Sequence, residues 1–232
     1  MKNYIIRLKN NPISEKYSKE CVEQAKKFNI EVEYFDAING MDYEKHLTKL
    51  KIYPKYNFKK GKPGVFGCFL SHYYLWQHCV KINEPLLILE HDGYFIRPLP
   101  DNILDKFTEV LKLDNLNPYS KNYNLALDTN SVLPESFEKY FNESAKVSNK
   151  INTGNYIKGA YSYIIKPTAA TKLLENIATN GFVPADQQIG DLLVDIRVVV
   201  PTVARLHPEY FRNVKGLSTT MHTELLTAVL YT

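Results

Sequence analysis

The chain has 232 residues, of which 44% are apolar and 23% are charged, values that are ordinary for a globular protein. They exclude an intrinsically disordered chain and a fibrous repeat, and the length suits one domain spanning residues 1–232. The net charge of +4 comes from lysines spread along the chain, without the basic stripe and recognisable motif of a nucleic-acid-binding protein. We therefore expect a folded protein that does not bind nucleic acid.

The cysteines and the apolar runs indicate a cellular setting. Cys21, Cys68 and Cys79 are odd in number and lack C-x-x-C spacing, which favours neither a disulfide framework nor a structural zinc site and indicates a reducing compartment. The N-terminal apolar run is too short for a signal peptide, and no run approaches the roughly 18 residues of a membrane-spanning helix. The expectation is a cytoplasmic protein, with peripheral membrane association left open.

The hydrophobic periodicity predicts alternating strands and helices from the N-terminus. In the first half we expect a strand at 4–8, an amphipathic helix at 14–28, a strand at 31–35, a surface loop or weak helices at 41–63, a buried helix at 67–80 and a strand at 86–89. In the second half we expect an edge strand at 95–100, a helix at 102–113, a strand at 123–127, mostly loop with one short helix at 128–152, a strand at 160–165, helices at 167–176 and 186–194, a strand at 196–200 and an irregular tail from 201.

The most informative feature is the apolar run 86–89 followed by Glu90, His91 and Asp92. A continuous apolar run predicts a strand covered on both faces, so the acids sit where that strand leaves the core. Two carboxylates one residue apart suit a hard divalent cation that bridges a diphosphate. As an isolated tripeptide, however, the pair fits equally a surface turn that caps the next element.

The surrounding residues resemble those of glycosyltransferase family 25, which comprises lipopolysaccharide-type galactosyl- and glucosyltransferases and the related procollagen galactosyltransferases. The resemblance begins with Gly64–His72 (GVFGCFLSH), followed by Leu87–Asp92 (LILEHD). It extends in the same order to Tyr4–Leu8, Phe35–Gly40, Gly159–Ile165 and Pro184–Asp186. Where the family has a second acid, this chain has His91.

The resemblance implies a GT-A-like α/β fold, with a mixed, mostly parallel central sheet flanked by helices. It also implies an enzyme of glycan or lipopolysaccharide biosynthesis, which transfers a hexose such as galactose or glucose from a UDP-sugar to a glycan or protein hydroxyl. The transfer would invert the anomeric carbon with the help of Mn²⁺ or Mg²⁺. The implied metal ligands are Asp92, as the most direct, Glu90 and a late histidine, His222.

The residues expected to contact the donor follow strand ends or lie in the buried helix. They are Arg7, Ala37, Asn39, Gly40, Ser71, His72, Glu90 and His91. Each has a plain alternative, because Arg7 fits a solvated arginine, 37–40 fits an ordinary turn, and His72 fits a hydrogen-bonded core histidine. His91 fits a weak metal ligand, a donor to the diphosphate, or a sign of reduced metal dependence.

The general base that an inverting transfer needs is expected to be Asp186, which matches the family's aspartate after Pro184. Asp186 fits equally well as a helix N-cap, and Asp128 is the reserve candidate. The C-terminal basic residues are expected either to close over the diphosphate or to lie on the surface. They are Arg205, His207, Arg212, Lys215 and His222.

Two other functions remain as alternatives. One is a degenerate transferase fold that binds a nucleotide or glycan without turnover, which His91 motivates. The other is a metal-dependent phosphohydrolase or nucleotidyltransferase, which the lack of a glycine-rich phosphate loop and of a second acidic cluster disfavours.

Overall fold

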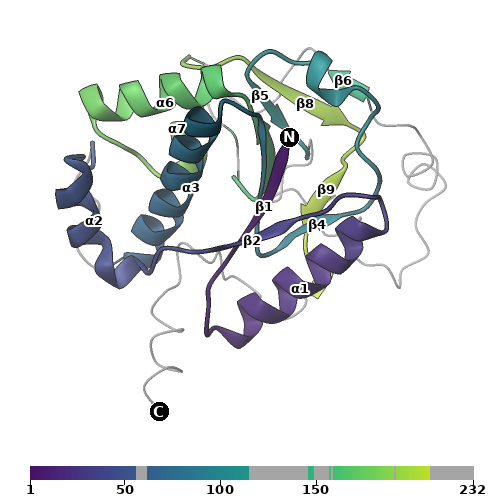
Figure 1. The fold of residues 1–232 in the computed structure, drawn as a ribbon, viewed down its shortest axis with the longest axis horizontal. Helices are drawn as coiled ribbons and strands as arrows, with labels where there is room; N and C mark the ends of the chain where they lie inside the picture. Colours follow the sequence, from purple (N-terminus) through teal and green to yellow (C-terminus); the bar gives the residue numbers. More distant parts are fainter. Residues whose placement is uncertain (56–61, 115–145, 149–156, 158, 191, 210–232) are drawn as a thin grey trace, which may run out of the picture.

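A computed structural model describes residues 1–55, 62–114, 146–148, 157, 159–190 and 192–209 (Figure 1). Within these residues the core is a seven-stranded sheet. Its strands, in spatial order, are β2 (Glu33–Asp36), β1 (Lys2–Arg7), β3 (Leu86–Glu90), β7 (Ser162–Ile165), β5 (Val110–Lys112), β8 (Ile196–Val200) and β6 (Lys146–Ser148).

The sheet is mixed, and most of its strands share one direction. β1 is parallel to both β2 and β3, and β5 is parallel to β8. β7 is antiparallel to its neighbours β3 and β5, and β6 is antiparallel to β8. The five strands β2, β1, β3, β5 and β8 therefore run one way and β7 and β6 the other. This confirms the expected GT-A-like α/β arrangement of a mixed, mostly parallel sheet flanked by helices.

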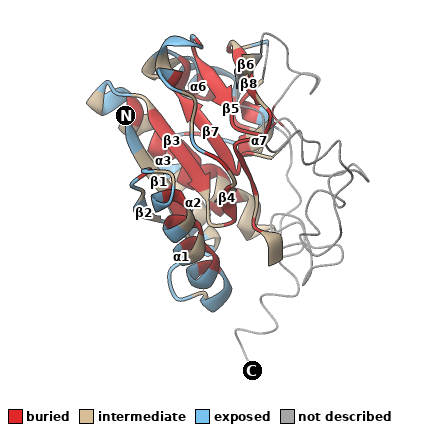
Figure 2. Cartoon of the chain, turned by 90° about the vertical axis from the view of Figure 1, so that its right-hand side faces the viewer, coloured by how far each residue is buried: buried red, intermediate tan, exposed pale blue. Residues whose placement is uncertain are grey.

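Each face of the sheet packs against its own cover. Helices α3 (Pro63–Ile82) and α6 (Pro167–Asn180) cover one face, where Leu86 and Ile88 of β3 point. Helix α1 (Pro12–Lys26) and a small sheet of β4 (Gly93–Phe95) and β9 (Ala204–Leu206) cover the other, where Leu87 and Leu89 point. Figure 2 shows the central strands β3, β7 and β5 buried between these layers. The unbroken apolar run of β3 follows from this burial on both faces.

Local signals set the ends of the two long helices that flank the site. The side chain of Asn11 caps α1 by accepting a hydrogen bond from the Ser14 N–H at 2.9 Å, and Pro12 is the first helical residue. α3 likewise begins at Pro63 and ends before Asn83, whose left-handed backbone (φ 52°) stops the helix. The shorter helices are η1 (Gly40–Asp42), α2 (Tyr43–Leu50), η2 (Ile103–Asp105) and α7 (Ala185–Gln188).

Several expectations from the sequence were wrong. The helix expected at 102–113 is a short 3₁₀ turn, η2, followed by strand β5, because residues 110–112 pair with β7 and β8 inside the sheet. The tail from 201 contains β9, which pairs with β4, and β6 lies in the stretch expected to be loop. The helix expected at 186–194 is the shorter α7.

The expected surface segment 41–63 contains the helix α2, and the expected edge strand at 95–100 is the earlier β4, outside the main sheet. The strand expected at 123–127 lies outside the described residues. Among the helices that the structure describes, none is both long enough and apolar enough to cross a membrane.

Candidate active site

The carboxyl ends of β1, β2 and β3 meet at one edge of the sheet. Arg7 is in register with Asp36, and its neighbour Ile6 is in register with Glu90. β1 therefore lies between the two strands, and the chain moves to β2 on one side of β1 and to β3 on the other. Such a reversal of strand order leaves a crevice at the carboxyl ends, where open α/β sheets bind their ligands.

The expected donor loop, residues 37–40, is held against the start of α3 by close backbone packing. A β-carbon at Gly40 would lie 1.9 Å from the Pro63 carbonyl oxygen, and one at Gly67 would lie 2.7 Å from the Ile38 carbonyl oxygen. The buried Ser71 Oγ accepts the Ile38 N–H at 2.9 Å and donates to the Gly67 carbonyl at 2.7 Å. Ser71 thus links the loop to α3 through these two hydrogen bonds. Its expected direct contact with the donor stays a prediction.

Asn39 is an exposed residue of this loop, and Arg7 is partly exposed at the end of β1. The Arg7 Nε donates to Asp36 Oδ1 at 3.0 Å, and its guanidinium lies 4.2 Å from the centre of the Tyr34 ring. The hydrogen bond from Arg7 is the main reason that the pKa of Asp36 lies below its usual value. Asn39 caps η1 by accepting the Met41 N–H at 3.0 Å. Arg7 therefore forms an ion pair with Asp36, a residue that no sequence signal singled out.

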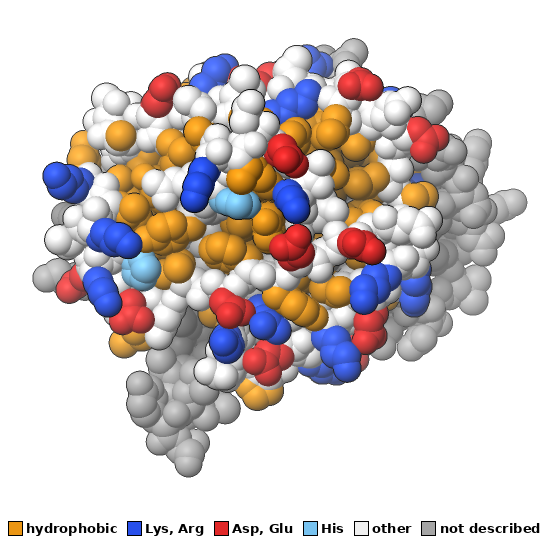
Figure 3. Space-filling model, in the orientation of Figure 1, with side chains coloured by type: hydrophobic (Ala, Val, Ile, Leu, Met, Phe, Trp, Pro, Cys, Tyr) orange, Lys and Arg blue, Asp and Glu red, His pale blue; other side chains and the backbone are white. Residues whose placement is uncertain are grey.

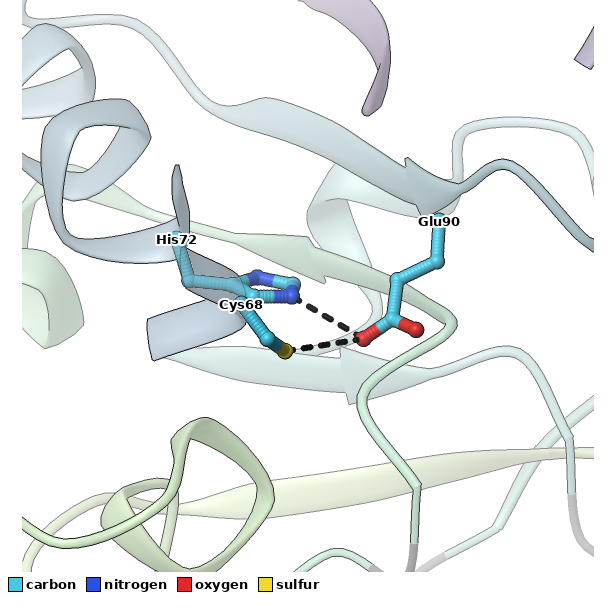
Figure 4. Close-up of side chains that lie close together, drawn as sticks. All are labelled: Cys68, His72 and Glu90. Atoms are coloured by element: carbon cyan, nitrogen blue, oxygen red, sulfur yellow. Dashed lines mark hydrogen bonds and ion pairs between the residues drawn. The ribbon is translucent and has the colours of Figure 1, made fainter. Parts of the chain in front are cut away.

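A buried chain of hydrogen bonds leads from the core to the strand end. The Trp76 indole N–H donates to the Tyr163 hydroxyl at 2.9 Å, and that hydroxyl lies 2.8 Å from His72 Nδ1. The other ring nitrogen, Nε2, lies 3.2 Å from Glu90 Oε1 (Figure 4). Trp76, Tyr163 and His72 are completely buried. His72 therefore fits both interpretations. Its Nδ1 is hydrogen-bonded within the core, as the alternative predicted, and its Nε2 contacts Glu90 at the site.

Glu90 also receives a hydrogen bond from a residue of α3. The Cys68 thiol donates to Glu90 Oε1 at 3.6 Å. Burial raises the pKa of Glu90. The hydrogen bond from His72 and the charges of His72 and His91 together lower it by more, so the net pKa lies below the usual value. Glu90 is therefore an ionised carboxylate whose Oε1 is engaged with α3.

Asp92 is 2% exposed, and among the described residues none offers a hydrogen bond to its Oδ1. Burial, opposed by the His91 charge and reinforced by Glu90, raises its pKa from 3.8 to about 6. The Asp92 carbonyl meanwhile accepts the His207 N–H at 2.7 Å, which fixes the backbone. A buried carboxylate oxygen without a donor is costly unless a proton or a cation satisfies it.

Asp186, the expected base, lies beside the same strand end. It is in the first turn of α7, whose N-cap is Pro184, and its Oδ1 accepts the Gln187 N–H at 3.0 Å. Asp186 is therefore not the N-cap residue. Burial first and the nearby Glu90 charge second raise the pKa of its carboxyl group. That influence places the Asp186 carboxylate within electrostatic reach of Glu90.

The segment Gly159–Tyr161 closes the edge of this site against the turn after β3. The Glu90 N–H donates to the Tyr161 carbonyl at 3.0 Å, and a β-carbon at Gly93 would lie 2.5 Å from the same oxygen. Gly159 has a φ of 78°, which favours glycine. These two glycines let the β7 side of the sheet approach the acidic turn closely.

The C-terminal basic residues divide into a buried pair and a group outside the described residues. Arg205 and His207 are buried, at 6% and 3% exposure, rather than on the surface. His207 Nε2 lies 2.8 Å from Glu20 Oε2, and its ring stacks on Tyr17 with centroids 4.4 Å apart. Asp128, Arg212, Lys215 and the expected metal ligand His222 lie outside the described residues.

The structure thus brings together at one edge of the sheet two groups of the expected residues. One group is Arg7, Ala37, Asn39 and Gly40; the other is His72, Glu90, His91, Asp92 and Asp186. Sequence reasoning missed Cys68 and Tyr163 as partners of this second group. The spacing of Cys68 and His72, four residues apart on a predicted helix, was a usable signal for Cys68, because such residues share a face.

The donor atoms at this edge suit a hard divalent cation at Asp92. Its buried Oδ1 lacks a donor among the described residues, and a carboxylate oxygen is the ligand that Mn²⁺ and Mg²⁺ prefer. Glu90 would contribute its Oε2, because Oε1 is engaged by His72 and Cys68. The carboxylates therefore fit the metal that the resemblance implies.

An open apolar pocket of about 480 Å³ lies on the α3 face of the sheet, separate from these acids. It is lined by Tyr4, Phe35, Ile38, Tyr74, Leu75 and His78. Figure 3 shows hydrophobic side chains gathered on the molecular face that carries α2, α3 and β1. Among the described residues that line this pocket there is no carboxylate, so the candidate chemistry is assigned to the polar edge instead.

Comparison with known proteins identifies the family. The model of glycosyltransferase family 25 (LPS biosynthesis protein) matches residues 1–189. A glycosyltransferase 25 family member from Aedes aegypti is 26% identical over 168 residues, which cover 69% of this chain and 26% of that protein. The lipooligosaccharide biosynthesis protein lic2B from Haemophilus influenzae is 33% identical over 105 residues, covering 44% of this chain and 37% of that protein.

The matches span only 26% and 37% of the length of these two relatives. Among solved structures, mouse xyloside xylosyltransferase 1 in its apo form aligns with 83% of this chain and 79% of its own, at 10% identity and a TM-score of 0.34, too distant to bear on the site. The family model covers β1 through α7 and with them every described acid of the candidate site. The chain therefore belongs to glycosyltransferase family 25.

Proposed function

We propose that the chain is a glycosyltransferase domain, spanning residues 1–232, that transfers a hexose from a UDP-sugar to a hydroxyl group of a glycan or protein. Galactose and glucose are the proposed sugars. The transfer proceeds with inversion and with the assistance of Mn²⁺ or Mg²⁺. Family membership and the acidic edge at β3 support this proposal.

The observation that carries the proposal is the state of Asp92. A carboxylate that is 2% exposed, with an oxygen that no described residue satisfies, costs the fold stability when ionised. Structural residues rarely retain such a group, whereas catalytic sites often do. A bound divalent cation would satisfy that oxygen, polarise the diphosphate and stabilise the departing UDP.

The neighbouring side chains divide the remaining tasks. Arg7 and the loop 37–40 lie at the carboxyl ends of β1 and β2, where the nucleotide would bind, and Ser71 fixes that loop to α3. Glu90, whose Oε1 is engaged by His72, would present its second oxygen to the donor and its metal. In this proposal these groups would bind or position the UDP moiety, so they would orient the leaving group rather than take part in bond making.

Asp186 is the proposed base. Its pKa is raised, chiefly by burial, so it takes up a proton more readily than an exposed aspartate. In a single displacement, the acceptor oxygen bonds to the anomeric carbon from the face opposite UDP, and the bond from that carbon to the UDP oxygen breaks. The acceptor hydroxyl proton passes to Asp186, and UDP departs with the bonding electrons.

The proposal is tested by incubating the full chain with UDP-galactose or UDP-glucose, with and without Mn²⁺, and following UDP release and the released sugar. Metal-dependent release with an inverted anomer, followed by NMR, is the expected result. The matched variants are Asp92→Asn and Asp186→Asn, with the exposed Asp101→Asn as the control.

Asp92→Asn should abolish the metal dependence, and Asp186→Asn should lower turnover on the order of 10²- to 10⁴-fold while UDP still binds. A retained anomer would refute the mechanism. Tight UDP binding without turnover on any donor would favour the binding module that His91 motivates. The absence of nucleotide binding would refute both.

A further inference from the structure

A second set of metal-ligand atoms lies behind the donor site. Cys68 and His72 lie one turn apart on α3, and Glu90 reaches them from the end of β3 (Figure 4). The Cys68 thiol, a ring nitrogen of His72 and a Glu90 carboxylate oxygen all lie within 4.8 Å of one another. Sulfur, imidazole nitrogen and carboxylate oxygen form a softer ligand set than the carboxylates that suit Mn²⁺.

Two of the three distances between these atoms match the edges of a tetrahedral zinc site. Zinc bonds of about 2.3 Å to sulfur and about 2.0–2.1 Å to nitrogen and oxygen imply edges of roughly 3.6 Å for S···O and roughly 3.3 Å for N···O. The observed separations from Glu90 Oε1 are 3.6 Å for Cys68 Sγ and 3.2 Å for His72 Nε2. The third edge, between Cys68 Sγ and a His72 ring nitrogen, is at most 4.8 Å, so an ion would need to draw these two side chains together only if that edge exceeds roughly 3.6 Å.

The histidine is also oriented as a ligand needs to be. Metal-binding histidines usually donate their other ring N–H to an oxygen, which fixes the ring. His72 Nδ1 lies 2.8 Å from the Tyr163 hydroxyl, whose position the Trp76 indole N–H fixes in turn. In the metal-bound state His72 Nδ1–H would donate to the Tyr163 hydroxyl, and Nε2, which lies 3.2 Å from Glu90 Oε1, would exchange its hydrogen bond with that carboxylate for a bond to the ion.

We propose that Cys68, His72 and Glu90 form a three-ligand binding site for a zinc-class divalent cation, adjacent to the hard-cation site at Asp92 and sharing Glu90 with it. Three protein ligands leave a fourth position for water, as in open zinc sites. Glu90 is 19% exposed and Cys68 is only partly buried, so both ligands are accessible to an ion from solvent. Binding displaces the thiol proton to solvent and leaves a thiolate on the ion.

Occupancy has a consequence for the donor site, which rests on the proposed function. Glu90 would serve both ions, because Oε1 faces α3 and Oε2 is left for the cation at Asp92. A zinc-class ion would fix the Glu90 carboxylate toward α3 and lower its charge. It would therefore weaken Mn²⁺ binding at Asp92.

The test uses Co²⁺, which replaces Zn²⁺ and reports its ligands by absorption. Titration of the reduced full chain, without nucleotide, should produce a near-ultraviolet thiolate-to-cobalt charge-transfer band and visible tetrahedral bands that saturate at one ion per chain. Equimolar Zn²⁺ should remove both. No charge-transfer band in the unsubstituted protein would overturn the proposal without the need for any variant.

Variants identify the ligands. Cys68→Ser should lose the charge-transfer band, and His72→Gln should weaken binding on the order of 100-fold, while Cys79→Ala, which alters another cysteine of α3, should bind as before. Tyr163→Phe should weaken binding about 10- to 100-fold through the ring orientation. A band that survives Cys68→Ser but vanishes in Cys79→Ala would place the ion elsewhere and refute the site.

Asp92→Asn separates this inference from the proposed function. It should keep the cobalt bands while losing Mn²⁺-dependent UDP binding. Absent bands together with normal transfer would refute the zinc-class site alone. Intact bands in a protein that never binds UDP would refute the transferase alone.

Discussion

The hydroxyl of Tyr163 lies 2.8 Å from Nδ1 of His72, and both side chains are completely buried. The same hydroxyl accepts the indole N–H of Trp76 at 2.9 Å. One oxygen on β7 therefore serves two ring nitrogens of α3 and aligns the helix with the end of β3. Through this oxygen the packing of the core determines the direction in which His72 points.

Tyr163→Phe should destabilise the fold, because it leaves two buried ring nitrogens without a partner, each costing about 1–3 kcal/mol. The control is Tyr74→Phe, which removes a similar tyrosine-histidine contact of 2.9 Å with His46, in a partly exposed position. Urea denaturation should show a loss of a few kcal/mol for Tyr163→Phe and less than about 1 kcal/mol for Tyr74→Phe. Equal losses would show that the buried network has no special role.

Asp92→Asn should stabilise the protein at alkaline pH. The folded pKa of about 6 lies above the value of 3.8 for an ordinary aspartate, so the folded state holds its proton more tightly. The contribution of Asp92 to the stability of the parent chain is therefore greatest below pH 4. It is lost as the pH rises through about 6. The variant, which cannot ionise, avoids this fall.

The expected gain is on the order of 3 kcal/mol at pH 8 and near zero at pH 4. Chemical denaturation of both proteins across that range, in the presence of a metal chelator, measures it. The exposed Asp101→Asn is the control. A variant less stable than the parent at pH 8 would mean that the ionised Asp92 is satisfied within the protein.

Gly67→Ala should separate the loop 37–40 from α3. The new methyl carbon would lie 2.7 Å from the Ile38 carbonyl oxygen and 3.0 Å from the Gly40 nitrogen, both backbone atoms that cannot turn away. We expect a loss of about 1–3 kcal/mol and weaker UDP binding. Scanning calorimetry measures the loss of stability, and titration calorimetry with UDP measures the loss of affinity. The control is Lys81→Ala, at an exposed position of the same helix, which should show neither effect.

His207 should make the fold sensitive to acid. Burial is the main reason that its pKa lies below the usual 6.5, against the opposing hydrogen bond with Glu20. The unfolded chain therefore takes up a proton first as the pH falls below 6.5, and stability falls with it. Nδ1 accepts the Glu209 N–H at 3.2 Å, a bond that protonation of this nitrogen breaks.

The melting temperature of the parent chain should thus fall between pH 7 and pH 5 by more than that of His207→Gln. The variant begins lower at pH 7, because it loses the stacking on Tyr17. His46→Gln is the control, and an unchanged pH slope in His207→Gln would contradict the assignment.

Patterns that are local in the chain predicted much of the fold. β3 was visible as an unbroken apolar run, and α1 and α3 as apolar residues at helical spacing. β5 and β9 are three-residue strands, and hydrogen bonds to distant segments determine both of them. A stretch as short as 110–112 carries too few residues to distinguish helical from strand periodicity.

The same limit applies to the site. The position of Glu90 and Asp92 at a strand end could be predicted, because both follow a buried run. The contact of His72 with Tyr163 joins residues 91 positions apart, and no local pattern announces it. The raised pKa of Asp92 likewise depends on how the turn after β3 is covered, which only the packed structure shows.

The central claim is that Asp92 holds the metal that binds the donor's diphosphate. Titration calorimetry of UDP into the full chain, with and without Mn²⁺, tests it most directly when repeated with Asp92→Asn. We predict that Mn²⁺ tightens UDP binding at least about 10-fold in the parent chain, equivalent to about 1.4 kcal/mol, and has no effect in the variant. UDP affinity that is independent of Mn²⁺ in the parent, or equally Mn²⁺-dependent in Asp92→Asn, would contradict it.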